Sequence, residues 1–147
     1  AAAPPPHVVV LGAAADVVTG AVPAGWTTIV AAAWDRGPGA SLRAGLTAVP
    51  GAESALIVLG DLPWLRTAAI RRVLAALTPG VIAARATDDG RPGHPVAIGP
   101  ALIDAARNAP DAGLAGLLRS AATLAVPCDG LGVTGGTRDR EVLAARK

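Results

Sequence analysis

Short runs of aliphatic and β-branched residues alternate along the chain with longer segments in which apolar residues recur every three or four positions. Four of the short runs predict strands, at residues 7–12, 27–32, 54–60 and 81–86. Helical spacing is seen at Leu42, Leu46 and Val49, and again at Ile70, Val73, Leu74 and Leu77. Strands separated by short helices are typical of βαβ units, so we expect an α/β fold with a mostly parallel sheet covered on both faces.

The second helical segment also has end signals. Thr67 is its predicted N-cap, and Pro79 with Gly80 predicts its end. Beyond residue 87 the pattern loosens around a turn-rich stretch, TDDGRPGHP. There we expect shorter elements, namely strands at 96–98 and 124–126 and helices at 101–108, 113–120 and 140–146.

Composition narrows the class of protein. The chain has 147 residues, which suits one domain over 1–147 with a substantial core, and it contains neither Phe nor Tyr. Its longest uncharged stretch, residues 17–34, contains Gly, Pro and Thr and is a poor membrane span. The start of the sequence shows no signal-peptide pattern, so we expect a cytoplasmic protein with no membrane partner.

Charge and cysteine content argue against nucleic-acid binding, a disulfide framework and a thiolate metal site. The formal net charge is +2 and the arginines are scattered, which gives no footprint for nucleic-acid binding. Cys128 is the single cysteine, so the chain has no disulfide framework and no thiolate metal site. We expect Cys128 to be an inert thiol and assign no role to His7.

Asp61 is the first candidate for chemistry. It follows an apolar run in the sequence LIVLGDLPWL, and ligands of open α/β sheets bind at the carboxyl ends of strands. Pro63 biases Leu62 toward an extended conformation, which keeps the loop from folding directly into a helix. A carboxylate at this point suits Mg²⁺, and it equally suits a turn in which the acid accepts local backbone hydrogen bonds.

The stretch DRGPGASLRAGL, residues 35–46, is the second candidate. Gly39 permits close backbone approach, and Ser41 lies near an expected helix start, where N–H groups favour an anion. Arg43 could bind a phosphate through the paired N–H donors of its guanidinium. The alternative is a loop, a helix start and a solvated arginine.

The third candidate is DGRPGHP, residues 89–95. It places Arg91 and His94 on a loop that Gly and Pro would make rigid. The histidine could bond a substrate phosphate or serve only the turn.

Taken together, the stretches GPGASLRAGL, ALIVLGDLPWL and GRPGHPVAIGPALIDAA resemble, in order and spacing, the MobA/MocA-like nucleotidyltransferases, and especially the molybdenum cofactor cytidylyltransferases. The resemblance runs over residues 7–120. It implies a Rossmann-like three-layer sandwich of the nucleotide-diphospho-sugar transferase type. It also implies Mg²⁺-dependent transfer of CMP or GMP from CTP or GTP to the phosphate of molybdopterin, with release of pyrophosphate.

The resemblance also implies residue roles. Asp61 matches the family's Mg²⁺-binding aspartate and is the predicted catalytic and metal-binding residue. Gly39, Ser41 and Arg43 match a segment on the nucleotide side. Gly93, His94 and Pro95 match a segment on the pterin side, to which Arg91 is added. The implied partners are a nucleoside triphosphate, molybdopterin or a related phosphate acceptor, and a molybdoenzyme.

Two parts of the family pattern do not match. The family begins with a strand and a Gly-rich phosphate loop, whereas residues 7–18 resemble its second strand and helix. Because the first strand lies inside the sheet, its loss would leave backbone groups unpaired at about 1–3 kcal/mol each. We therefore expect about 40–50 further residues before Ala1, a length typical of one βαβ unit. Near the C-terminus, Gly136 and Arg138 stand at positions where the family has acids.

Two other functions stay open. One is a non-catalytic relative that binds a nucleotide or pterin or delivers cofactor to a molybdoenzyme. The other is a nucleotidyltransferase of another pathway, against which the Gly-His-Pro stretch argues.

Overall fold

The protein is described by a computed structural model over residues 3–135. Its residues fall into two compact units, each built from segments distant in sequence. Ser54–Gly99 and the segment that begins at Ala122 form the first, which we call the four-stranded unit. Pro4–Glu53 and Pro100–Ala121 form the second, which we call the two-stranded unit. The helix predicted at 140–146 lies outside the described residues.

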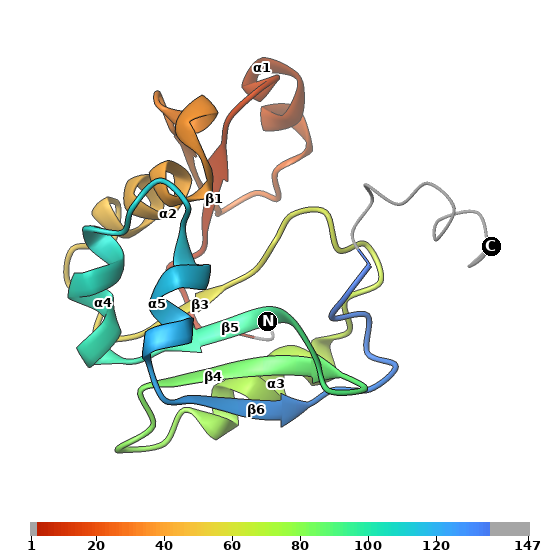
Figure 1. Ribbon diagram of the computed structural model, residues 1–147. Coiled ribbons are helices and arrows are strands. Elements are labelled where there is room, and N and C mark those ends of the chain that lie inside the picture. The colour runs from red at the N-terminus through yellow and green to blue at the C-terminus, as the bar shows by residue number, and fades with distance from the viewer. Residues whose placement is uncertain (1–2, 136–147) are drawn as a thin grey trace. The chain divides into compact units, whose positions relative to one another are not determined.

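The four-stranded unit contains one sheet and one helix (Figure 1). Its elements are β3 (Ala55–Ile57), α3 (Thr67–Ala76), β4 (Ala83–Asp88), β5 (Arg91–Ile98) and β6 (Thr123–Pro127). The strand order is β3-β5-β4-β6, with β4 and β6 parallel and β5 antiparallel to both β3 and β4. Three strands therefore share one direction, and the expected parallel character is interrupted by β5 alone.

The antiparallel strand comes from a tight hairpin. Asp89 and Gly90 link β4 to β5 with φ angles of 49° and 75°. Two successive positive φ values define a type I′ turn, which matches the twist of paired strands. The loop predicted at residues 91–95 is wrong, because these residues form β5 together with the predicted strand at 96–98. The Asp-Gly pair is the local signal that predicts the hairpin.

The strand predicted at 54–60 is shorter than expected. Only Ala55–Ile57 pairs, and Val58 and Leu59 are 42% and 46% exposed. The register aligns Ile57 with Val96, so the next residue would lie opposite Pro95, which has no N–H to donate. The chain consequently leaves the sheet before the acid, and Asp61 does not follow the strand directly.

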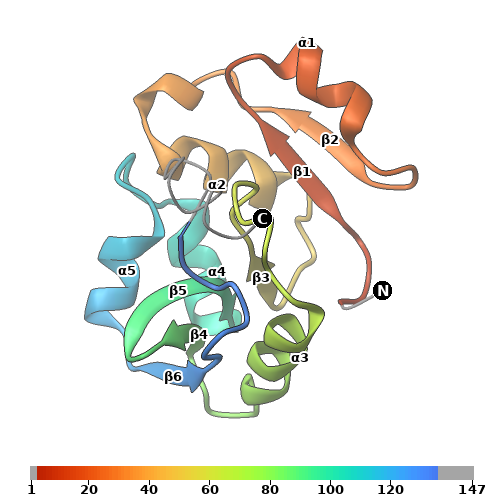
Figure 2. The same cartoon turned by 90° about the vertical axis from the view of Figure 1, so that its right-hand side faces the viewer.

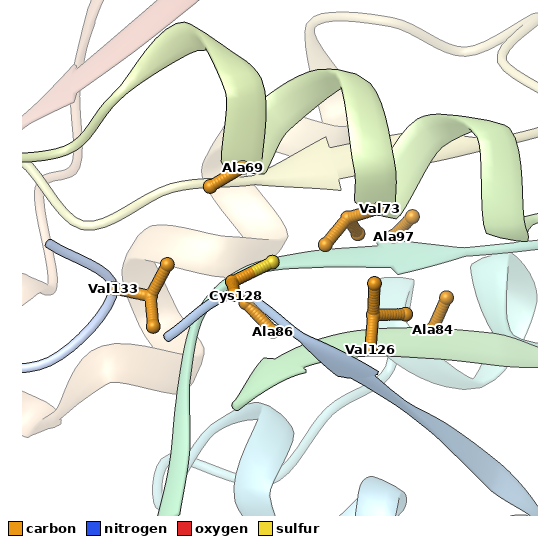
Figure 3. Packing of buried hydrophobic residues seen from close by; sticks show 8 residues of the cluster. All are labelled: Ala69, Val73, Ala84, Ala86, Ala97, Val126, Cys128 and Val133. Carbon is orange, nitrogen blue, oxygen red and sulfur yellow. The ribbon is translucent and has the colours of Figure 1, made fainter. Parts of the chain in front are cut away.

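The core of the four-stranded unit lies between α3 and the sheet (Figure 3). Ala69 and Val73 of α3 face small side chains from three strands and the segment that follows β6; these are Ala84, Ala86, Ala97, Val126, Cys128 and Val133. Small residues let the helix approach the strands closely. The helix begins at Thr67 itself, with Arg66 at the N-cap, so the predicted cap is one residue off.

The two-stranded unit pairs β1 (Val8–Leu11) with β2 (Thr27–Val30) in parallel (Figure 2). Its helical segments are α1 (Ala15–Val18), η1 (Thr19–Ala21), η2 (Trp34–Arg36), α2 (Pro38–Thr47), α4 (Pro100–Arg107) and α5 (Leu114–Ser120). Helix α2 packs on β1, where a Cβ added to Gly45 would stand 2.9 Å from Val10 Cγ2. Between residues 3 and 135 no helix has the length and apolar character to cross a membrane.

Candidate functional site

Asp61 lies in the loop between β3 and α3, four positions after Ile57, and is partly buried. The loop is fixed by backbone hydrogen bonds: Leu65 N donates to Leu62 O at 3.1 Å, and Arg66 N donates to Leu131 O at 3.0 Å. Asp61 thus stands on a constrained loop beyond the carboxyl end of a strand, the position at which α/β sheets bind ligands.

His94 lies near Asp61 within the same unit. Its ring Nδ1 is 3.3 Å from the carbonyl oxygen of Ile57, the last residue of β3. Burial lowers the pKa of His94, the Ile57 carbonyl raises it, the charge of Arg85 lowers it and the charge of Asp61 raises it. Because the carbonyl can only accept, Nδ1 carries the proton, and in the neutral ring Nε2 is an acceptor. Two predicted site residues, Asp61 and His94, therefore both belong to the four-stranded unit and lie at or beyond the end of β3.

Gly93 lets this site form. His94 N donates to Val133 O at 2.9 Å, and a Cβ at Gly93 would collide with the carbonyl of Val133. The segment after β6 can approach β5 only because residue 93 has no side chain.

Arg85 belongs to this site and was missed in the sequence. It lies on β4, is partly buried, and its Nε donates to Gly93 O at 3.0 Å. Burial lowers the pKa of Arg85. The signal that could have found it is a lone cation within the apolar strand run VIAARA.

Arg91 occupies a different environment. Its side chain is 72% exposed and lies 4.0 Å from Asp88 Oδ2. Asp88 also accepts hydrogen bonds from Gly130 N at 3.2 Å and from Thr134 Oγ1 at 3.0 Å. Among the predicted residues on the pterin side, His94 and Gly93 lie beside Arg85, while Arg91 lies at the hairpin turn.

Gly39, Ser41 and Arg43 lie on α2, in the two-stranded unit. Gly39 N donates to Asp111 O at 2.9 Å, and a Cβ at Gly39 would collide with the carbonyl of Pro110. Ser41 is the fourth residue of the helix, which begins at Pro38 and so earlier than expected.

The guanidinium of Arg43 is engaged within that unit. It donates to Ala109 O and, at 2.6 Å, to Asp111 Oδ1. Arg36 Nη2 lies 2.9 Å from the other carboxylate oxygen of Asp111. These arginines lower the pKa of Asp111, Arg43 most strongly. Arg43 therefore holds the 109–111 segment against the start of α2.

The candidate metal ligand at this site is one carboxylate, that of Asp61. Over the part of the chain that the structure describes, no group of three His, Cys, Asp or Glu side chains could hold a metal ion. Mg²⁺ commonly takes one or two carboxylates and completes its shell with water and substrate phosphates. Asp61 fits that mode, and the positions of Gly136 and Arg138 lie outside the described residues.

An α/β unit with an aspartate beyond β3 and a Gly-His-Pro strand beside it is the arrangement expected of a nucleotidyltransferase. The chain belongs to the MobA-like NTP transferase domain family, whose model matches residues 1–138. The predicted family and its Rossmann-like α/β fold are thereby confirmed. A search of curated protein sequences found no match.

Solved structures agree with this assignment. The chain is similar to Rv0371c of Mycobacterium tuberculosis H37Rv at 26% identity and a TM-score of 0.75, over 95% of this chain and 75% of that chain. The manganese complex of Rv0371c matches at 24% identity and a TM-score of 0.72, over 94% and 77%. A nucleotidyl transferase from Methanothermobacter, Mth528, matches in fold at 19% identity and a TM-score of 0.70, over 95% and 71%.

Proposed function

We propose that this nucleotidyltransferase domain transfers CMP or GMP from CTP or GTP to the phosphate of molybdopterin or a related phosphate acceptor, in the cytoplasm and with Mg²⁺ as cofactor. The observation that carries the proposal is geometric: Asp61 lies on the loop beyond the end of β3, and the ring of His94 lies 3.3 Å from the carbonyl oxygen of Ile57 at the end of that strand. The Gly-His-Pro stretch supports molybdopterin as the acceptor, and a molybdoenzyme is the expected recipient of the product.

The reaction needs positioned phosphates and neutralised charge more than a covalent catalyst. An oxygen of the acceptor phosphate forms a bond to the α-phosphorus of the nucleotide, and the bond from that phosphorus to the oxygen bridging to the β-phosphate breaks, releasing pyrophosphate. When bound, Mg²⁺ would neutralise charge on the reacting phosphates. Asp61 would hold the cation, and Nε2 of the neutral His94 ring would accept the proton of a singly protonated acceptor phosphate.

On the nucleotide side, the proposal assigns the start of α2. Gly39 is assigned to the nucleotide side by the family resemblance; its close backbone neighbours in the structure are Pro110 and Asp111. Arg43 would act by holding Asp111 and the carbonyl of Ala109 in place, since both are its partners. Ser41 would contribute its hydroxyl.

Pyrophosphate release by the full-length protein tests the proposal. We expect turnover with Mg²⁺, molybdopterin and one of CTP and GTP. Binding of nucleotide and pterin without turnover would instead support the non-catalytic relative. No turnover with either nucleotide would contradict the enzymatic assignment.

A further inference from the structure

Arg85 is a charged residue in an otherwise apolar strand. Its neighbours Ala83, Ala84 and Ala86 on β4 are fully buried. The register of β4 and β5 shifts between Arg85 and Thr87, so the regular ladder is interrupted beside Gly93. At this interruption the side chain, through Nε, donates to the carbonyl of Gly93 at 3.0 Å. The guanidinium is therefore held at one atom, next to the Gly-His-Pro sequence.

The charge of Arg85 has no carboxylate partner among residues 3–135. Arg43 and Arg107, whose side chains are 28% and 26% exposed, both form ion pairs, with Asp111 and Asp104. Arg85 is also partly buried, yet none of the ion pairs between described residues includes it. Burying a cation without a counter-ion costs free energy, and a bound anion would offset that cost. Arg85 thus has the environment of a ligand-binding cation.

The position of this cation indicates its ligand. Its charge acts on the ring of His94, as does that of Asp61, and all three residues lie in the four-stranded unit. We propose that Arg85 binds the phosphate of the acceptor substrate and holds it beside His94. The inference rests on the proposed function in that it takes the acceptor to be a phosphate monoester.

The geometry of the guanidinium suits this role. With Nε engaged by Gly93, the two terminal nitrogens can bond two oxygens of one phosphate group. The third oxygen is then left to attack the α-phosphorus of the nucleotide, and pyrophosphate leaves. Because the nucleotide also carries phosphates, the test must separate the two substrates.

Steady-state kinetics separates them. In the full-length enzyme, Arg85→Gln should raise the KM for molybdopterin about 10- to 100-fold, the loss expected for a charge-assisted pair of bonds, and leave the KM for the nucleotide unchanged. The KM of Arg85→Lys for molybdopterin should lie between those of Arg85→Gln and the wild type, because lysine keeps the positive charge but lacks the paired donors of the guanidinium. Arg71→Gln, at an exposed position of α3, is the matched control and should leave both constants unchanged. A raised nucleotide KM with an unchanged acceptor KM would overturn the inference.

A second test does not depend on turnover. The chain has two histidines, His7 and His94, so their ring NMR signals can be followed separately. Titration with inorganic phosphate should shift the His94 signals in the wild type and in Arg71→Gln, and the shift should be lost in Arg85→Gln. The His7 ring, stacked on Trp26 in the other unit, is the internal reference. Equal shifts of His94 in all three proteins would overturn the inference. A phosphate-dependent shift that needs Arg85, found together with no turnover, would support the inference while contradicting the proposed function.

Discussion

The ring of His94 shows how neighbouring groups set the chemistry of one residue. Its Nδ1 donates to the carbonyl of Ile57, and burial, this carbonyl and the charges of Arg85 and Asp61 determine its ionisation. The net effect lowers its pKa below the ordinary value, which favours the neutral ring near neutral pH. The sequence showed the histidine in its motif, but the partners come from β3, β4 and the loop after β3.

Substitutions of the two charged neighbours should move the His94 pKa in opposite directions. Arg85→Gln removes a positive charge that disfavours the imidazolium, so the pKa should rise. Asp61→Asn removes a negative charge that favours it, so the pKa should fall. Titration of the ring signals by NMR measures both changes, and a pKa that stays fixed in both variants would contradict the placement of these charges.

At the scale of elements, the β4–β5 hairpin brings Gly93 and His94 into the sheet. Its turn depends on the positive φ of Gly90, 75°, at a position where an added Cβ would meet nothing within 4 Å. Backbone conformation alone is therefore the reason for glycine at this position.

Gly90→Ala should destabilise the protein by about 1–2 kcal/mol, the cost of placing an L-residue in the left-handed region. Gly51→Ala is the matched control. A Cβ added at Gly51 would also meet nothing within 4 Å, but Gly51 does not have a positive φ. Urea denaturation measures both free energies of unfolding. Equal effects of the two substitutions would contradict the assigned turn.

The start of α2 offers a second prediction at this scale. Arg43 and Asp111 are joined at 2.6 Å, so single substitutions Arg43→Gln and Asp111→Asn should each destabilise the protein, and their effects should not add. A double-mutant cycle in urea measures the coupling free energy, which we expect at about 0.5–3 kcal/mol. Additive effects would show that the ion pair does not hold the 109–111 segment.

At the scale of the whole molecule, the α/β class followed from the alternation of apolar runs with helical spacing, and α2, α3, α4, α5, β1 and β2 lie close to their predicted positions. What the sequence prediction missed follows from the β4–β5 hairpin and from the pairing of β5 with β3. The early end of β3 follows from Pro95 on its neighbour, and the role of Arg85 follows from the carbonyl of Gly93. The Asp-Gly pair signals the hairpin, but the strand register that sets these two contacts does not follow from the spacing of apolar residues. The preceding strand and phosphate loop and the cytoplasmic setting stay predictions. So do the roles of all the predicted site residues, namely Gly39, Ser41, Arg43, Asp61, Arg91, Gly93 and His94.

The central claim is that Asp61 holds the cation for nucleotidyl transfer. Pyrophosphate release by the full-length protein, measured with CTP or GTP, Mg²⁺ and molybdopterin, tests it most directly. Asp61→Asn should lower kcat about 100-fold or more, the scale seen when one electrostatic contact of a transition state is removed. Glu53→Gln, the same chemical change at an exposed position, should retain the wild-type rate. Wild-type turnover by Asp61→Asn would contradict the account.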